Sequence, residues 1–325
     1  MSTENNEREL EAGIVTDLSG RMTYGSYLSL DQLLTAQNPV SVPEHHDELL
    51  FIIQHQTTEL WLKQLLHELS SARELLASDD LREALKRVAR VKRIQDVMTQ
   101  QWAILATLTP TEYAQFRGAL GNSSGFQSVQ YRAVEFALGN KNEKMLSVFA
   151  DHPANLALLT AEWHKPTLYD EFLRYASRRG LPVPASILDR DVREPYRETP
   201  ELVPAIREIY RSHQEHWDLY EACEDLVDLE DNFQFWRFRH LKTVARTIGM
   251  KVGTGGSSGV GFLQRALDLT FFPELYTART EIGGGCSRSR SSTARTGARA
   301  SSTTLQDGCA CATTSPRRIS PASTA

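Results

Sequence analysis

One histidine of this sequence sits at the centre of an apolar helical stripe. The stripe advances by four, three, four and four residues through Leu229, Phe233, Trp236, His240 and Val244. These steps place all five side chains on one face of a helix. A histidine in such a stripe is most often an ordinary core residue. A neutral imidazole on a rigid helix, walled by apolar side chains, is also what a ferrous haem requires as axial ligand. The pattern alone leaves both interpretations open.

His55 has a similar setting. Phe51 lies four residues before it, and Leu62 continues the same face seven residues after it. Two histidines on two long helices could face opposite sides of one planar cofactor, although His55 by itself is more simply a structural residue.

Other metal sites fit the spacing less well. No histidine has a glutamate three residues before it, and the zinc motif His-Glu-x-x-His is missing from the sequence. His213 and His216 could share a metal, but no third ligand is evident.

Two further segments are rich in polar side chains. Arg117 follows Tyr113 by four residues, and a guanidinium is suited to hold a carboxylate by two hydrogen bonds. An arginine in such a segment can equally be an ordinary surface residue. The glycine-rich segment 253–259 lacks the lysine of a phosphate-binding loop and follows a helix instead of a strand. We interpret it as a loop that closes over a polar or anionic ligand group.

Helical periodicity dominates the remaining sequence. We expect long helices over 47–69, from about 85 to 105, and from about 225 to 248, the last ending before Gly249. A further helix should begin near Pro200 and Pro204 and present a face made of Ile206, Ile209, His213, Trp217 and Tyr220. No segment shows sustained strand-type alternation. The predicted fold is all-α, a single-domain bundle of long helices.

Composition narrows the class of protein. Hydrophobic residues make up 41% of the chain and charged residues 24%, which is typical of a globular protein. The net charge of −5 argues against a nucleic-acid surface. The N-terminus is acidic and has no apolar run, so we expect neither a signal peptide nor a membrane span. Four scattered cysteines do not form a disulfide framework, and a cytoplasmic location is expected.

The two ends of the chain differ from its body. Residues 1–19 are expected to form a flexible N-terminal segment. In residues 283–325, Ser, Thr, Ala, Gly and Arg make up 34 of 43 positions. A segment of this composition has too little apolar surface to bury for stable folding. We expect this tail to be disordered, and we interpret it as the product of a frameshift or read-through.

Six segments of the body form an ordered set of motifs. Three lie in the N-terminal half: Tyr24-x-x-Tyr27-Leu28-x-Leu30-Asp31-x-Leu33-Leu34, His46-Asp47-Glu48-x-Leu50-Phe51-Ile52-x-x-His55-Gln56 and Glu59-Leu60-Trp61-x-Lys63. Three follow later: Ser124-Gly125-Phe126-Gln127-Ser128-x-Gln130-Tyr131-Arg132, Arg237-x-Arg239-His240-Leu241 and Gly253-Thr254-Gly255-Gly256-Ser257-Ser258-Gly259. Together they resemble the tryptophan 2,3-dioxygenase family over residues 20–282. Several independent motifs in the same order make the resemblance specific.

The resemblance implies a helical dioxygenase domain over 20–282 that encloses a pocket for haem b, one per subunit and Fe(II) in the active state. His240 matches the proximal iron ligand of the family. The other residues expected around the haem are Trp102, Ser124, Gly125, Tyr131, Arg132 and Trp236, with Arg132 near a propionate.

The resemblance also implies the substrates L-tryptophan and O2, and the product N-formyl-L-kynurenine. His55 matches the distal histidine that meets the indole N–H, and we expect it to orient the substrate, because an indole N–H is too weak an acid for easy removal by imidazole. Arg117 matches the carboxylate clamp, and Thr254 the residue that holds the ammonium end and the glycine-rich loop. Phe51, Tyr113 and Leu120 would line the indole pocket.

The family is homotetrameric, and its N-terminal segment, here with Tyr24 and Tyr27, reaches a neighbouring subunit's site. Phe262 and Tyr276 stand where relatives often carry Tyr and Trp, and both changes conserve aromatic bulk. Two alternatives remain: a non-enzymatic haem sensor that uses both histidines as ligands, and a haem dioxygenase acting on another indoleamine. Arg117 favours a substrate with an amino-acid carboxylate.

Overall fold

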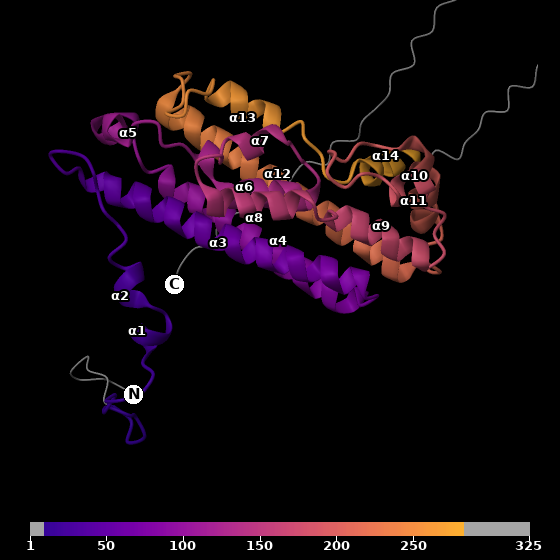
Figure 1. The fold of residues 1–325 in the computed structure, drawn as a ribbon, viewed down its shortest axis with the longest axis horizontal. Coiled ribbons are helices and arrows are strands. Elements are labelled where there is room, and N and C mark those ends of the chain that lie inside the picture. Colours follow the sequence, from indigo (N-terminus) through magenta and orange to yellow (C-terminus); the bar gives the residue numbers. More distant parts are fainter. Residues whose placement is uncertain (1–9, 283–325) are drawn as a thin grey trace, which may run out of the picture. The chain divides into compact units, whose positions relative to one another are not determined.

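The computed structural model describes residues 10–282, and these contain helices and no strand (Figure 1). The all-α prediction is confirmed. The expected disordered tail 283–325 lies outside the described residues, as do positions 1–9 of the expected flexible N-terminal segment.

The helices of the first half of the chain are α1 (Tyr24–Tyr27), α2 (Leu30–Leu33), α3 (His46–Ala77), α4 (Leu81–Leu105), α5 (Pro110–Arg117), η1 (Gly118–Leu120), η2 (Gly125–Gln127), α6 (Val129–Leu138), α7 (Lys144–Ser147) and α8 (Pro153–Trp163). The helices of the second half are α9 (Leu168–Arg178), α10 (Ala185–Leu188), η3 (Pro200–Leu202), α11 (Val203–Arg211), α12 (Trp217–Ile248), α13 (Val260–Ala266) and α14 (Pro273–Glu281).

Three long helices form the framework of the fold. α4 packs along α3 on one side and along α12 on the other (Figure 1). Each contributes an apolar stripe to one continuous core, which includes Leu65 and Leu69 of α3, Val91 and Met98 of α4, and Leu229 and Phe233 of α12. These residues repeat at helical steps of four and seven, so the sequence pattern itself selects the faces that meet.

Local signals explain where several helices begin and end. The Asp80 side chain accepts a hydrogen bond from the backbone N–H of Glu83 and caps α4. Thr109 and Glu112 form a capping box ahead of α5, with Pro110 in its first turn. α12 ends at Gly249, whose φ of 61° is unfavourable for residues with a side chain, so this predicted boundary is confirmed.

The predicted helix that carried Ile206, Ile209, His213, Trp217 and Tyr220 on one face is wrong. α11 ends at Arg211, turns occupy 212–216, and Trp217 and Tyr220 belong to the start of α12. Apolar residues continue at helical spacing across the turn, so periodicity alone could not reveal the break. Two other helices are longer than predicted. α12 begins eight residues before the predicted start, and α3 runs on to Ala77, beyond the predicted end at Leu69, because the helical spacing of buried residues continues through both extensions.

Shorter helices surround this framework. α6 packs on α3 and on α8, α9 packs on α3, α13 packs on α12, and α11 packs on α14. The segment before α3 is attached through Glu48, whose buried carboxylate accepts hydrogen bonds from the backbone N–H groups of Val40 and Ser41 at 2.8 and 3.0 Å. In the part of the chain described here, no helix combines the length and apolarity needed to cross a membrane.

Candidate active site

His240 lies among aromatic rings between α4 and α12. Its imidazole is stacked on the Trp102 indole, with ring centroids 4.6 Å apart and planes inclined by 9°. The Trp236 indole, one turn earlier on α12, lies 5.8 Å from His240 and 5.6 Å from Trp102. Tyr131 of α6 adds a ring 5.6 Å from Trp236. Tertiary packing thus brings together four residues expected around a haem.

The surroundings of His240 hold its imidazole in the uncharged form. Burial among apolar side chains, followed by repulsion from the charge of His55, lowers the pKa of His240 to about 4. Within residues 10–282, no hydrogen bond engages either of its ring nitrogens. A neutral imidazole with free lone-pair capacity is the form that binds a transition-metal ion.

His55 is held in one tautomer. Its Nδ1 lies 2.7 Å from the carbonyl oxygen of Phe51, and because a carbonyl can only accept, Nδ1 carries the proton and donates it. Burial also lowers the pKa of His55, so the ring is neutral near pH 7. Its Nε2 is therefore an unprotonated acceptor, suited to a ligand N–H. The Phe51 ring, 4.2 Å from the imidazole, fixes the ring plane further.

Buried donors near His240 fit the anionic edge of a haem. Indole Nε1 of Trp102, indole Nε1 of Trp236 and guanidinium Nε of Arg132 are buried and have no hydrogen-bond partner among the described residues. Unpaired buried N–H groups are rare in folded proteins because each costs the hydration that it loses. An apolar wall, a neutral imidazole and unpaired donors together suit a planar group with carboxylates at its rim.

A buried ionic network adjoins these rings. The Glu135 carboxylate bridges two guanidinium groups: it accepts hydrogen bonds from Arg132 at 2.5 Å and from Arg237 at 2.8 Å. Arg237 also donates to the Tyr131 hydroxyl at 3.1 Å and to the carbonyl of Ala266 at 3.0 Å. Two arginines against one carboxylate leave a net positive charge, which would complement an anionic group.

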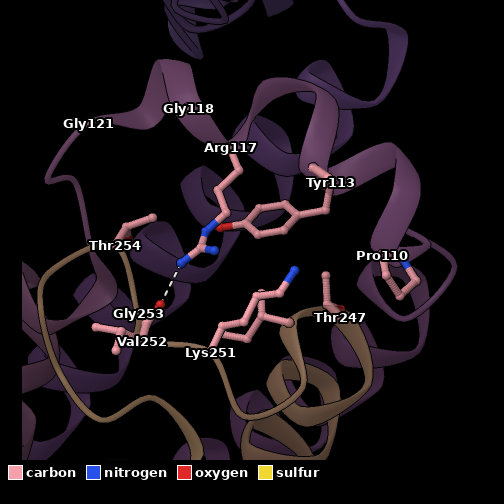
Figure 2. A pocket seen from close by; sticks show the side chains of 12 residues that line it. Pro110, Tyr113, Arg117, Gly118, Gly121, Thr247, Lys251, Val252, Gly253 and Thr254 are labelled. Atoms are coloured by element: carbon pink, nitrogen blue, oxygen red, sulfur yellow. Dashed lines mark hydrogen bonds between the residues drawn. The ribbon is translucent and has the colours of Figure 1, made fainter.

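A pocket of about 580 Å³ opens between α5 and the end of α12. It brings together three predicted substrate residues, Tyr113, Arg117 and Thr254 (Figure 2). The Arg117 guanidinium donates to the carbonyl of Val252 and points into this space. The Tyr113 ring packs 5.7 Å from Phe51, which links the pocket to His55. Leu120 is half-buried against the main core and does not line this pocket, although its neighbour Gly121 does.

The glycine-rich loop closes one side of the pocket. The Thr254 hydroxyl donates to the carbonyl of Ser123 at 2.5 Å and fastens the loop to the segment before η2. A Cβ atom on Gly255 would lie 2.7 Å from the Cβ of Ser124, so a larger residue cannot occupy this position without displacing one of the two segments. Ser124 itself caps η2, in which Gly125 is the first residue.

The N-terminal tyrosines are not part of this arrangement. Tyr24 and Tyr27 are 78% and 73% exposed, and they lie on α1. Their predicted role in a neighbouring subunit's site stays a prediction.

Three residues of the site were assigned no role from the sequence. Arg237 lies three residues before His240, and Glu135 lies three after Arg132, but only the packing of α6 on α12 reveals their ion pair. Lys251 lines the pocket opposite Arg117, and its position next to the glycine-rich loop was the only available signal.

Comparison with known proteins identifies the family of the chain. The family model described as tryptophan 2,3-dioxygenase matches residues 9–178 and 204–282. A tryptophan 2,3-dioxygenase of Kineococcus radiotolerans is 67% identical over 282 residues, which cover 87% of this chain and 99% of the relative. Relatives of the same name from an Arthrobacter species (87% of this chain, 100% of the relative) and Serratia proteamaculans (86% and 99%) are 65% and 59% identical. The chain belongs to the tryptophan 2,3-dioxygenase family.

Proposed function

We propose that this protein inserts both atoms of O2 across the indole C2–C3 bond of L-tryptophan and yields N-formyl-L-kynurenine, the first step of the kynurenine pathway. The reaction combines one substrate molecule with one O2 and releases nothing else. The observation that carries the proposal is the pair of neutral imidazoles, His55 from α3 and His240 from α12, beside a pocket that contains a guanidinium.

The family depends on haem, and we assign haem b to the aromatic cluster, one per subunit and ferrous in the active state. His240 would bind the iron, and Trp102 and Trp236 would wall the ring. Tyr131, Ser124 and Gly125 would complete its surroundings, while Arg132 would pair with a propionate. When bound, the haem supplies the activation of dioxygen.

The protein itself holds the amino acid in place. Arg117 would pair with the substrate carboxylate, and Thr254 would bind the ammonium end while it keeps the loop docked. Phe51, Tyr113 and Leu120 would enclose the indole ring. Correct placement of two reactants contributes up to about 7–11 kcal/mol to lowering a barrier, so binding and orientation are a large share of the catalysis.

His55 would accept a hydrogen bond from the indole N–H. The donation from Nδ1 to the Phe51 carbonyl supports this role, because it leaves the Nε2 lone pair for the substrate. The same bond fixes the ring, so His55 would orient the indole. The indole nitrogen would stay protonated, because its N–H is too weak an acid for easy removal by imidazole. Exclusion of water by Phe51 and Tyr113 would strengthen this hydrogen bond.

We also propose a homotetramer in which Tyr24 and Tyr27 complete a neighbouring subunit's site. Support comes from the exposed apolar residues of the N-terminal segment, which include Leu34 at 69% and Val42 at 96%. Residues 20–282 would form the catalytic domain, in agreement with the end of the family match at 282. The cytoplasmic location stays a prediction.

One experiment tests the function directly. The full chain is purified, loaded with haem, reduced and mixed with L-tryptophan in air, and the absorbance of N-formyl-L-kynurenine is followed. Formation of product with one O2 consumed per tryptophan is expected. Haem binding without product would contradict the proposal and favour a haem sensor.

A further inference from the structure

The pocket between α5 and the end of α12 contains two basic side chains and no acidic one. Arg117 and Lys251 are the charged residues among those that line it, and the remaining lining residues are apolar, glycine, tyrosine or threonine. Figure 2 shows the Lys251 side chain rising from the loop side of the pocket, with its amine directed toward Tyr113. Both charged side chains on the wall of this space are therefore positive.

The Lys251 amine is not neutralised by the protein. Within the described residues, no carboxylate lies within ion-pair distance of its Nζ, and no hydrogen bond engages it. Lys92, in contrast, is paired with Asp225 and Asp228. Arg117 has its own anchor on the carbonyl of Val252, the residue next to Lys251.

One carboxylate needs only one guanidinium to be held by two hydrogen bonds. A second cation in the same pocket is not required for the clamp, but it raises the electrostatic potential at the place where the carboxylate binds. A ligand with a negative group gains from this potential. A ligand with only an ammonium group is repelled by both cations.

We propose that Lys251 determines the charge selectivity of the pocket: it favours ligands that carry a carboxylate and disfavours amines that lack one. The assignment rests on the proposed function, since it places the amino-acid end of the substrate in this pocket. By the same field, Lys251 directs the carboxylate, and not the ammonium group, toward Arg117. It is thus a specificity-determining residue and not part of the chemistry at the indole.

The test compares three ligands that share the indole ring and differ in net charge. Indole-3-propionate is an anion, L-tryptophan a zwitterion and tryptamine a cation. Their binding to the full haem-loaded ferric protein is measured by calorimetry, before and after Lys251→Met. The variant is expected to bind indole-3-propionate about three- to fivefold more weakly, the scale of one partly exposed charge pair. Tryptophan should lose less, and tryptamine should bind more tightly.

Two control variants separate charge from shape. Lys251→Arg keeps the charge and is expected to preserve the order of the three ligands. Lys242→Met removes an exposed lysine whose amine lies over the Phe238 ring, outside the pocket, and should leave all three affinities unchanged. Because salt screens exposed charges, raising the ionic strength should reduce the difference between the wild type and Lys251→Met.

A change of equal size for all three ligands would show that Lys251 acts only through the shape of the pocket and would overturn the inference. So would unaltered affinities, or a wild-type protein that does not bind indole-3-propionate. These binding measurements do not depend on turnover. Affinities that change in the order of ligand charge, without formation of N-formyl-L-kynurenine, would support the role of Lys251 and contradict the proposed reaction. Product formation with unaltered affinities would support the reaction and contradict the role of Lys251.

Discussion

The imidazole of His240 and the indole of Trp102 are parallel to within 9°, with centroids 4.6 Å apart. Trp102 comes from α4 and His240 from α12, so the stack joins two long helices at the candidate site. An aromatic pair of this kind contributes about 0.5–1.5 kcal/mol beyond the area it buries. Because the stack sets the plane of the imidazole, Trp102 would position the proposed iron ligand.

Replacement of His240, the proposed iron ligand, should remove the cofactor. We expect His240→Ala to lose its haem and its activity together, since no other side chain on α12 offers a neutral imidazole at this place. The haem absorbance per protein after reconstitution measures the effect. His164→Ala, which changes an exposed histidine, is the control and should bind haem as the wild type does. An unchanged haem spectrum in His240→Ala would show that another residue binds the iron.

His55→Ala should keep its haem and lose only part of the rate. Loss of a single orienting hydrogen bond costs about 0.5–1.5 kcal/mol, or roughly two- to thirteenfold in kcat/KM. A general base would contribute about 100- to 10,000-fold. In the benzothiophene analogue of tryptophan, sulfur replaces the indole N–H, so this substrate cannot donate the hydrogen bond to His55. The substitution should therefore lower kcat/KM for the analogue much less than for tryptophan. A loss of 100-fold or more with tryptophan would assign His55 to proton removal.

Arg117→Leu should weaken tryptophan binding and spare ligands that have no carboxylate. A hydrogen-bonded charge pair of this type is worth about 2–3 kcal/mol, so KM for L-tryptophan should rise roughly 30- to 150-fold. The affinity for tryptamine, measured by calorimetry, should change little or improve. Equal losses for both ligands would remove the carboxylate clamp from the mechanism.

Gly255→Ala should push the glycine-rich loop away from the segment before η2. The added Cβ would meet the Cβ and Oγ of Ser124 at 2.7 and 2.9 Å, and overpacking of this kind costs about 1–3 kcal/mol. The expected result is a higher KM for tryptophan, because Thr254 loses its place at the pocket. The double variant with Ser124→Gly removes the clash and should recover part of the loss. If Ser124→Gly does not lower the KM of the Gly255→Ala variant any more than it changes the KM of the wild type, the contact with Ser124 is not the cause of the loss.

Glu230 should make the stability of the fold depend on pH. Burial raises the pKa of its carboxyl group to about 7 from an ordinary 4.5, although it accepts hydrogen bonds from the backbone N–H groups of Phe271 and Phe272. The folded state therefore holds this proton more tightly than the unfolded state. Its stabilising effect is complete below pH 4.5 and is lost as the pH rises to 7, by about 3 kcal/mol in total.

Glu230→Gln isolates this contribution. The amide does not titrate, and it offers one acceptor where the carboxylate offers two. Relative to a wild type whose Glu230 carboxyl is protonated, we therefore expect the variant to be less stable by about 1 kcal/mol. The free energy of unfolding of the wild type, measured with denaturant from pH 5 to 8, should fall relative to that of the variant as the pH rises, so that the variant becomes the more stable protein near pH 8. A difference that is independent of pH would contradict the raised pKa.

The sequence by itself determined the helical class, most of the long helices and the family. Steps of three and four residues mark the buried faces of α3, α4 and α12, because the apolar residues on one face of an amphipathic helix recur with the helical period. Gly249 and the caps at Asp80 and Thr109 act only on residues close to them in the chain. The ends of these helices can therefore be predicted from a short stretch of sequence. The same periodicity brought His55 and His240 forward as the candidate pair.

Only the tertiary structure decided which distant side chains meet. The turn at 212–216 interrupts a pattern that remains helical in sequence, so the end of α11 depends on packing against α14 and α12. The stack of Trp102 on His240 and the pocket shared by Arg117 and Lys251 join residues more than 130 positions apart. Such contacts depend on how helix surfaces interlock and rotate against one another. This relation between helices has no counterpart in the spacing of residues within any one of them.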